Sequence, residues 1–365
     1  MTKLRDICRF QSGGTPSRGT PAYFNGNIPW ITTVALNGDV IDGNQAIEWI
    51  TDEAIAKSAA KIVPPHSVMI GTRVGIGKVA INSVPMSTSQ DIISLIGIDE
   101  NKWDKKFICH LITANKEHLN SQARGATIKG IKIEVIANLV LPEISVKEQA
   151  RVSEIIGKVD ALICMQQQMA RNLDQLIKSR FIELFGDQTA NPYGWQQTSI
   201  GACCTLKSGM SLPADKENEG GAIPYVKVGD MNYPGNEQYI TTSSRFVSEQ
   251  TAGTGVFPVG TVVFPKRGGA IGTNKKRLTS LPICADLNVM GVTAGRRLTP
   301  QYLMAYFDTV DLGTLNNGSS VPQINNKDIA PLLICIPPMA LQEQFAAFVE
   351  QTDKSKLCGK MEVAA

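Results

Sequence analysis

The two halves of this chain repeat the same short motifs about 195 residues apart. A period this long indicates a duplicated domain rather than a solenoid or propeller repeat. The chain is therefore predicted to fold as two similar units whose loops differ. The matched segments are Ser12–Gly13 with Ser208–Gly209, Ile28–Ile31 with Ile223–Val226, Leu141–Pro142 with Ile336–Pro337, and Glu148–Gln149 with Glu343–Gln344.

Length and composition leave room for two or three domains with full cores, because the chain has 365 residues and 43% of them are hydrophobic. The net charge of +3, from 36 basic and 33 acidic residues, neither requires nor excludes a polyanionic partner. No stretch reaches the roughly 20 apolar residues of a membrane helix, and the N-terminus lacks a signal-peptide pattern. We therefore expect a cytoplasmic protein without membrane contact.

The longest periodic segment runs from about Lys147 to Phe185 without a proline. Ser145 and Glu148 have the spacing of a capping box, and Gly186 provides a stop signal. A helix of this length is on the order of 55 to 60 Å long, more than a compact domain needs, so we predict a spacer.

A second helix is expected after Pro338, where the same apolar pattern restarts. Two such helices can pair antiparallel as a coiled coil, although each could instead only cap its own domain. The heptad pattern ends after Lys356, so the second helix is expected to be roughly half as long as the first. The residues expected to pair are Val152, Ile156, Val159, Ile163, Leu173 and Ile177 with Phe345, Phe348 and Val349.

The remaining sequence is rich in short apolar runs between Gly, Pro, Thr and Asn, which predicts short strands joined by turns. One helix over about 102–119 and its counterpart over 300–307 are expected to pack on the sheets. The predicted fold is mixed α/β, with two duplicated β-rich globular domains and a long central helix that pairs with a shorter C-terminal one. The predicted segments are 1–145 and 188–339 for the domains, and 146–187 and 340–365 for the helices.

Several of these motifs, taken in order, resemble the specificity subunits of type I restriction-modification enzymes. The resemblance covers nearly the whole chain and is carried by Ile7–Pro16, Gly26–Ile31, Ala123–Thr127, the Leu-Pro and Glu-Gln entry to the long helix, Phe185–Asp187 and Asn191–Trp195. It implies two target recognition domains, each reading one short half-site of double-stranded DNA, with the helices setting an unspecific spacer. It further implies a subunit without catalysis or cofactor, whose methyltransferase and restriction/motor partners perform the chemistry. The shortened tail departs from the family pattern and leaves self-association open.

Motifs for other chemistry fail on inspection. The glycine-rich segment Gly71–Lys78 misses the spacing of a phosphate loop, and Val79 stands where a magnesium-binding hydroxyl is required. Asn191–Gly194 lacks the second proline of the methyltransferase Asn-Pro-Pro-Tyr loop and is interpreted as a turn. Eight cysteines and three histidines show no spacing of a zinc site, so no metal is expected.

Candidate DNA contacts are the basic, amide and hydroxyl side chains of the polar loops, because such groups bind phosphates and base edges. Arg73 and Arg267, which are 194 residues apart and follow a predicted strand in each half, are the strongest candidates. A surface ion pair is the alternative role for such an arginine. The candidates are Thr15, Arg18, Thr32, Thr33, Arg73, Lys78, Gln90, Arg124 and Lys129 in the first half, and Lys207, Ser208, Lys227, Lys266, Arg267, Lys275, Lys276, Asn316 and Asn317 in the second.

Two other classes of function remain open. A non-catalytic protein-assembly scaffold could use the same duplicated loops to bind proteins. An enzyme with an unrecognised site is disfavoured by the shortage of histidine and of convergent acids. Salt-dependent retention on heparin or duplex DNA distinguishes a DNA-binding protein from a scaffold.

Overall fold

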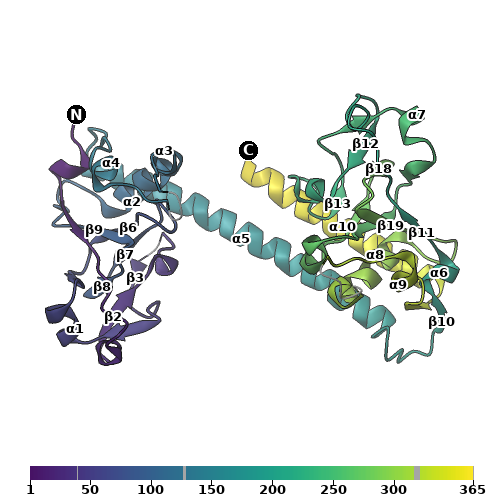
Figure 1. Ribbon diagram of the computed structural model, residues 1–365, viewed down its shortest axis with the longest axis horizontal. Coiled ribbons are helices and arrows are strands. Elements are labelled where there is room, and N and C mark those ends of the chain that lie inside the picture. Colours follow the sequence, from purple (N-terminus) through teal and green to yellow (C-terminus); the bar gives the residue numbers. More distant parts are fainter. Residues whose placement is uncertain (39, 126–128, 316–320, 365) are drawn as a thin grey trace. The chain divides into compact units, whose positions relative to one another are not determined.

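The computed structural model describes residues 1–38, 40–125, 129–315 and 321–364, which form two compact units (Figure 1). Unit 1 comprises Met1–Leu162 and unit 2 comprises Ile163–Ala365. The division falls within the long helix α5 (Val146–Phe185), so each half of that helix belongs to the unit against which it packs.

Unit 1 is built on two small sheets. A five-stranded sheet has the order β1-β9-β6-β7-β3, and a four-stranded sheet has the order β4-β2-β8-β5. The second sheet is mixed, because β2 pairs parallel with β8 and antiparallel with β4. The strands are β1 (Arg9–Ser12), β2 (Ile28–Ile31), β3 (Val40–Ile41), β4 (Glu48–Ile50), β5 (Ile62–Val63), β6 (Val68–Gly71), β7 (Val79–Asn82), β8 (Met86–Thr88) and β9 (Ile92–Ile96).

Unit 2 repeats this plan. Its sheets have the orders β11-β19-β16-β17-β13 and β14-β12-β18-β15, and β12 pairs parallel with β18 as β2 does with β8. A further pair, β10-β20, corresponds to an isolated bridge between Lys3 and Val140 in unit 1. The duplication predicted from the sequence is thus confirmed by topology. The strands are β10 (Gln196–Ser199), β11 (Cys204–Ser208), β12 (Ile223–Val226), β13 (Tyr239–Ile240), β14 (Phe246–Val247), β15 (Val256–Phe257), β16 (Thr261–Pro265), β17 (Arg277–Thr279), β18 (Ile283–Ala285), β19 (Val289–Ala294) and β20 (Leu333–Ile336).

One helix packs against the five-stranded sheet of each unit. In unit 1, Ile108 and Ile112 of α2 are buried with Val68 and Leu95 of the sheet. The single helix expected over 102–119 is divided at Asn115 into α2 and α3. None of the described helices is both long and apolar enough to cross a membrane. Besides α5, the helices are α1 (Asp52–Lys57), α2 (Lys105–Ala114), α3 (Lys116–Ser121), α4 (Ile133–Ala137), α6 (Ile200–Cys203), α7 (Glu249–Ala252), α8 (Pro300–Thr309), α9 (Asn326–Ile329) and α10 (Met339–Ala364).

Helix α5 begins and ends where the sequence predicts. The backbone N–H of Ser145 donates to Glu148 Oε2 at 2.9 Å, and the backbone N–H of Glu148 donates to Ser145 Oγ at 3.3 Å, which completes the capping box. At the other end Gly186 has φ +72°, and a Cβ atom there would lie 2.5 Å from Pro192 Cγ. Only glycine allows this turn without strain, so it fixes the end of the helix.

Helix α10 packs antiparallel to the C-terminal half of α5 within unit 2. The ring centroids of Phe181 and Phe345 are 5.6 Å apart, and Lys356 Nζ lies 2.6 Å from Asp174 Oδ1. From Phe345 to Lys356 the chain advances eleven residues along α10, while the contacted residues on α5 go back seven, from Phe181 to Asp174, so the two helices run antiparallel. The long side chain of Lys356 accounts for the difference between the two numbers. The predicted helix pairing is confirmed here, although α10 has 26 residues against 40 in α5 rather than half as many.

The residues predicted to pair divide into two groups. Phe345 and Val349 are buried in the core of unit 2, with Ile177 packed against them, and the ring of Phe348 lies 5.9 Å from the guanidinium of Arg180. Val152 and Val159, by contrast, are 36% and 47% exposed. Ile156, Ile163 and Leu173 are half-buried. The N-terminal residues of this seam therefore lack the close packing expected of a complete coiled coil.

A buried glutamine attaches each long helix to its own unit. Gln149 of α5 donates to Lys102 O at 3.1 Å and accepts from the backbone N–H of Asp104 at 2.9 Å. Gln342 of α10 makes the same two contacts, with Arg297 O at 3.0 Å and Thr299 N at 2.9 Å. The structural counterpart of Gln149 is thus Gln342, whereas the sequence repeat had matched it with Gln344.

Candidate nucleic-acid interface

The two arginines favoured by the sequence occupy the same place in the two units. Arg73 lies two residues after β6, and Arg267 lies two residues after the corresponding strand β16. The residue before each arginine accepts a backbone hydrogen bond of 2.9 Å, from Ile131 N in unit 1 and Ile324 N in unit 2. Both arginines are exposed. The duplication therefore presents one guanidinium at an equivalent edge of each unit.

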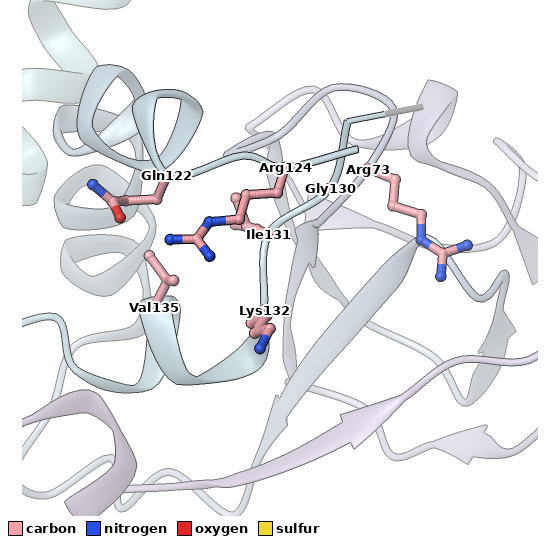
Figure 2. A pocket seen from close by; sticks show the side chains of 7 residues that line it. All are labelled: Arg73, Gln122, Arg124, Gly130, Ile131, Lys132 and Val135. Atoms are coloured by element: carbon pink, nitrogen blue, oxygen red, sulfur yellow. The ribbon is translucent and has the colours of Figure 1, made fainter. Parts of the chain in front are cut away.

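In unit 1 this edge is hollowed into a cavity of about 550 Å³ (Figure 2). Three of the lining residues are cationic and two are aliphatic, with no acidic residue among those that line it. Figure 2 shows the guanidinium of Arg124 pointing towards Gln122 and Val135, while Arg73 lies on the other side of Gly130 and points away from them. The lining residues are Arg73, Gln122, Arg124, Gly130, Ile131, Lys132 and Val135.

Backbone hydrogen bonds hold the wall of this cavity in place. Arg124 and Gly130 exchange two N–H···O bonds of 2.9 Å each. A Cβ atom at residue 130 would lie 3.1 Å from Arg73 Cγ, so glycine permits the close approach of this segment to the arginine. Arg73 Nη1 is 3.5 Å from Asp91 Oδ1, a long contact for a side chain that is 51% exposed. Since exposed ion pairs contribute little, this guanidinium can leave Asp91 for a phosphate.

The other candidates in unit 1 are not equally available. Lys78, Gln90 and Lys129 are exposed, whereas Thr15 and Thr32 are half-buried. Thr33 is 5% exposed within a 3₁₀ turn, so its side chain is not accessible to DNA in this conformation.

Arg18 of unit 1 is exposed but is held by its own unit. Its guanidinium donates both Nη groups to Glu48, with 2.8 Å between Nη2 and Oε2, and lies 4.4 Å from the ring centroid of Phe24. The hydrogen bonds from Arg18 lower the pKa of the Glu48 carboxyl. This arginine is thus fixed in the structure that surrounds it.

In unit 2 most of the predicted lysines make internal contacts. Lys227 Nζ lies 2.6 Å from Glu217 Oε2, and Lys266 Nζ donates to Ser208 Oγ at 3.0 Å. Lys207 donates to the carbonyl of Val256 at 3.2 Å, and Lys275 donates to Asn232 Oδ1. Asn316 and Asn317 lie outside the described residues. Arg267 is therefore the candidate of this unit that the structure leaves most accessible.

Lys276, another predicted DNA contact, is buried in this structure. The residue is 4% exposed, and its Nζ donates to Val310 O at 2.7 Å and to Asn274 Oδ1 at 2.9 Å. The run Lys275–Arg277 resembles a basic surface in sequence, but Lys276 points inward just before β17. Its ammonium group therefore stabilises the surrounding loops and is not available to bind a ligand.

The buried lysine predicts a pH dependence of stability. Burial lowers the pKa of Lys276 from 10.5 to about 8. Between these values the unfolded chain binds more protons than the native one, so the free energy of unfolding rises with pH across that window. Between pH 8 and 10.5, the free energy of unfolding measured in urea should rise by up to about 3 kcal/mol more in the wild type than in Lys276→Met. Parallel pH profiles for the two proteins would contradict the assignment.

Two polar residues that line the cavity were not predicted as DNA contacts from the sequence. Gln122 directly follows α3, and Lys132 is the N-cap residue of α4. Their spacing from Arg124 indicated nothing by itself, because the two positions converge only through the pairing of Arg124 with Gly130. Among the described residues, no three of His, Cys, Asp and Glu come together in a way that could hold a metal ion.

Comparison with known proteins links this geometry to one family. The family model described as "Type I restriction modification DNA specificity domain" matches residues 1–183 and again 192–359. The MjaIX specificity subunit of Methanocaldococcus jannaschii is 23% identical over 374 residues, which cover 96% of this chain and 85% of that protein. The EcoR124I/EcoR124II specificity subunit of Escherichia coli is 31% identical over 166 residues, covering 44% of this chain and 40% of that protein.

Two solved structures share the fold along the whole chain. The S subunit of a type I restriction-modification system from M. genitalium has a TM-score of 0.59 at 15% identity, covering 100% of this chain and 91% of that one. A chain from a study of complex assembly and conformational transition of the type I R-M system has a TM-score of 0.59 at 17% identity, covering 100% and 92%. At these identities the likeness concerns the fold.

Proposed function

The chain belongs to the type I restriction modification DNA specificity family, and we propose that each of its two units reads one half of a bipartite DNA site. It is a DNA-specificity subunit of a restriction-modification system. The single observation that carries the two-unit proposal is the duplicated edge, where Arg73 and Arg267 stand exposed two residues after equivalent strands. The loops around them differ between the units, which suits two different half-sites.

The cationic cavity of unit 1 supports a contact with the DNA backbone. Arg73, Arg124 and Lys132 contribute three cationic residues to the lining of a space of about 550 Å³. Arginine forks and lysine ammonium groups are the usual ligands of phosphate in protein–DNA complexes. We assign this cavity to a backbone phosphate of the half-site that unit 1 reads.

We further propose that partner subunits dock on α5 and supply methyl transfer and DNA cleavage. Apolar side chains of one row of α5 remain outside the core, with Ile155 52%, Leu162 54%, Met169 58% and Leu176 48% exposed. A row of this kind is typical of a protein–protein interface. The same row could instead pair two copies of this chain, which sedimentation of the purified protein without partners would detect.

A protein-assembly scaffold is the alternative from another class. Nothing in a scaffold requires a cationic cavity free of acidic residues, so the geometry favours DNA. Retention on duplex DNA with a steep dependence on salt is expected for the specificity subunit. Retention that salt does not alter would favour the scaffold.

Arg73→Ala tests the role of the cavity. Because the guanidinium is assigned to a phosphate, we expect weaker binding to every duplex sequence by a similar factor, with a reduction of about 1 in the slope of log K against log salt. The matched control is Lys102→Ala, since that side chain is 76% exposed and lies outside the cavity. A loss confined to one sequence, on the order of 1 to 3 kcal/mol, would assign Arg73 to a guanine instead.

The length of α5 is expected to set the spacer between the half-sites. Insertion of seven residues after Gln166 lengthens a helix by about 10 Å and turns it by only about 20° from its former phase. The spacer in the recognised sequence should therefore grow by about three base pairs. Insertion of two residues turns the helix by about 200° and should abolish bipartite binding. An unchanged spacer after the heptad insertion would show that the length of α5 does not set the distance between the half-sites.

A further inference from the structure

The duplicated edge carries different chemistry in the two units. Backbone geometry aligns Gly130 of unit 1 with Gln323 of unit 2, since each precedes the isoleucine whose N–H donates to the residue before the equivalent arginine. Gly130 also lies close to the side chain of Arg73, and Gln323 forms an isolated bridge with Arg267. The position after the shared isoleucine differs as well. Lys132, which precedes α4, corresponds to Asn325, which precedes α9.

In unit 1 the group beside the arginine is a second cation. Lys132 lines the cavity with Arg124, and Gly130 adds no side chain. An ammonium group has donors and no acceptor, so it cannot distinguish one base edge from another by a paired donor and acceptor. The chemistry of this edge fits a phosphate.

In unit 2 the groups beside the arginine are amides. Gln323 Nε2 donates to Asn325 Oδ1 at 3.0 Å, and Asn325 is held in turn by a capping box with Asp328, whose Oδ2 accepts from Asn325 N at 2.8 Å. The bond to Asn325 fixes the orientation of the Gln323 amide next to Arg267. Both amides are half-buried, which limits their motion further.

A fixed amide beside an exposed guanidinium is the pair of groups that reads bases in the major groove. Glutamine and asparagine bind the N6 and N7 edge of adenine, and arginine binds the O6 and N7 edge of guanine. An amide that its neighbour already orients loses little conformational freedom on binding.

We propose that the duplicated edge holds a backbone phosphate in unit 1 and reads base edges in unit 2, where Gln323 determines specificity with Arg267 beside it. The inference rests on the proposed function, because it presumes that both units bind DNA. Of the two equivalent positions, the one in unit 2 carries the sequence information.

The test selects binding sites from a randomised duplex library with the full chain, co-purified with its partner subunits. Gln323→Ala should lose discrimination at one base pair of one half-site by about 5- to 150-fold, with the salt slope unchanged. Lys132→Ala should weaken binding to all sequences equally and lower the salt slope by about 1, with the preferred sequence unchanged. Equal weakening on all sequences by Gln323→Ala, or a changed base preference in Lys132→Ala, would overturn the proposal.

Gln323 contacts Asn325, the residue that caps α9, so Gln323→Ala could disturb the fold. A second variant distinguishes a folding defect from a loss of base reading. Gln323→Glu keeps the size of the side chain but removes its donors, so the preferred base at the same position should shift from adenine towards cytosine, whose N4 group donates. If this variant folds and keeps the wild-type preference, Gln323 does not read that base. A wild-type protein that selects no sequence at all would refute the proposed function itself, which is a separate outcome.

Discussion

Replacement of residues 1–145 with the corresponding segment of another specificity subunit is expected to change one half of the recognised DNA sequence and to leave the other half intact. The physical reason is that the described sheets and core clusters of unit 1 are formed within that unit. Its loops can therefore be exchanged without altering the packing around Arg267. Selection of duplexes from a random library, or mapping of methylated bases with the partner subunits present, measures the outcome.

The junction of this exchange has a structural requirement. Gln149 of α5 stays in the chain, but its partners Lys102 O and Asp104 N belong to the incoming segment. Both are backbone groups, so the incoming segment must supply the same turn rather than the same residues. Gln149→Ala in the unaltered chain provides the control, because it removes the attachment without changing any loop. A chimera in which both half-sites change would contradict modular reading.

Much of the architecture could be predicted from the sequence because its signals are local. Ser145, Glu148 and Gly186 define the ends of α5 through contacts within three to six residues, and the structure places the helix between them. The antiparallel partner α10 was predicted from the same apolar pattern. What the pattern could not supply is which part of each helix is in contact, since Val152 and Phe345 have similar hydrophobicity but are 36% and 0% exposed.

The candidate site was less predictable because burial and hydrogen bonding depend on distant residues. Lys276 and Lys275 are neighbours in sequence, yet Lys276 reaches Val310 O and is buried. Gln323 was not selected as a contact, and only the bridge to Arg267 brings it to the duplicated edge. The number of residues between equivalent positions of the two units also varies, from 194 between Arg73 and Arg267 to 193 between Gln149 and Gln342, because short insertions and deletions change the register.

Phe185→Ala is expected to be the most destabilising single substitution proposed for unit 2. Phe185 is fully buried near the end of α5, with ring centroids 4.7 Å from Tyr302, 5.5 Å from Phe345 and 5.2 Å from Phe181. Removal of a buried ring of this kind costs about 3 to 5 kcal/mol, because burial is lost and a cavity remains. Since these rings join α5, α8 and α10, the loss should also loosen the paired helices.

The measurement is the free energy of unfolding in urea, followed with hydrogen exchange to resolve the two units. Unit 2 should unfold at lower urea than in the wild type, while exchange in the sheets of unit 1 should be unchanged because no residue of this cluster belongs to unit 1. Ile182→Ala is the matched control on the same turn of α5, since Ile182 is 47% exposed and its truncation should cost about 0.5 kcal/mol or less. Equal losses for the two variants would mean that the aromatic cluster does not hold α5 to unit 2.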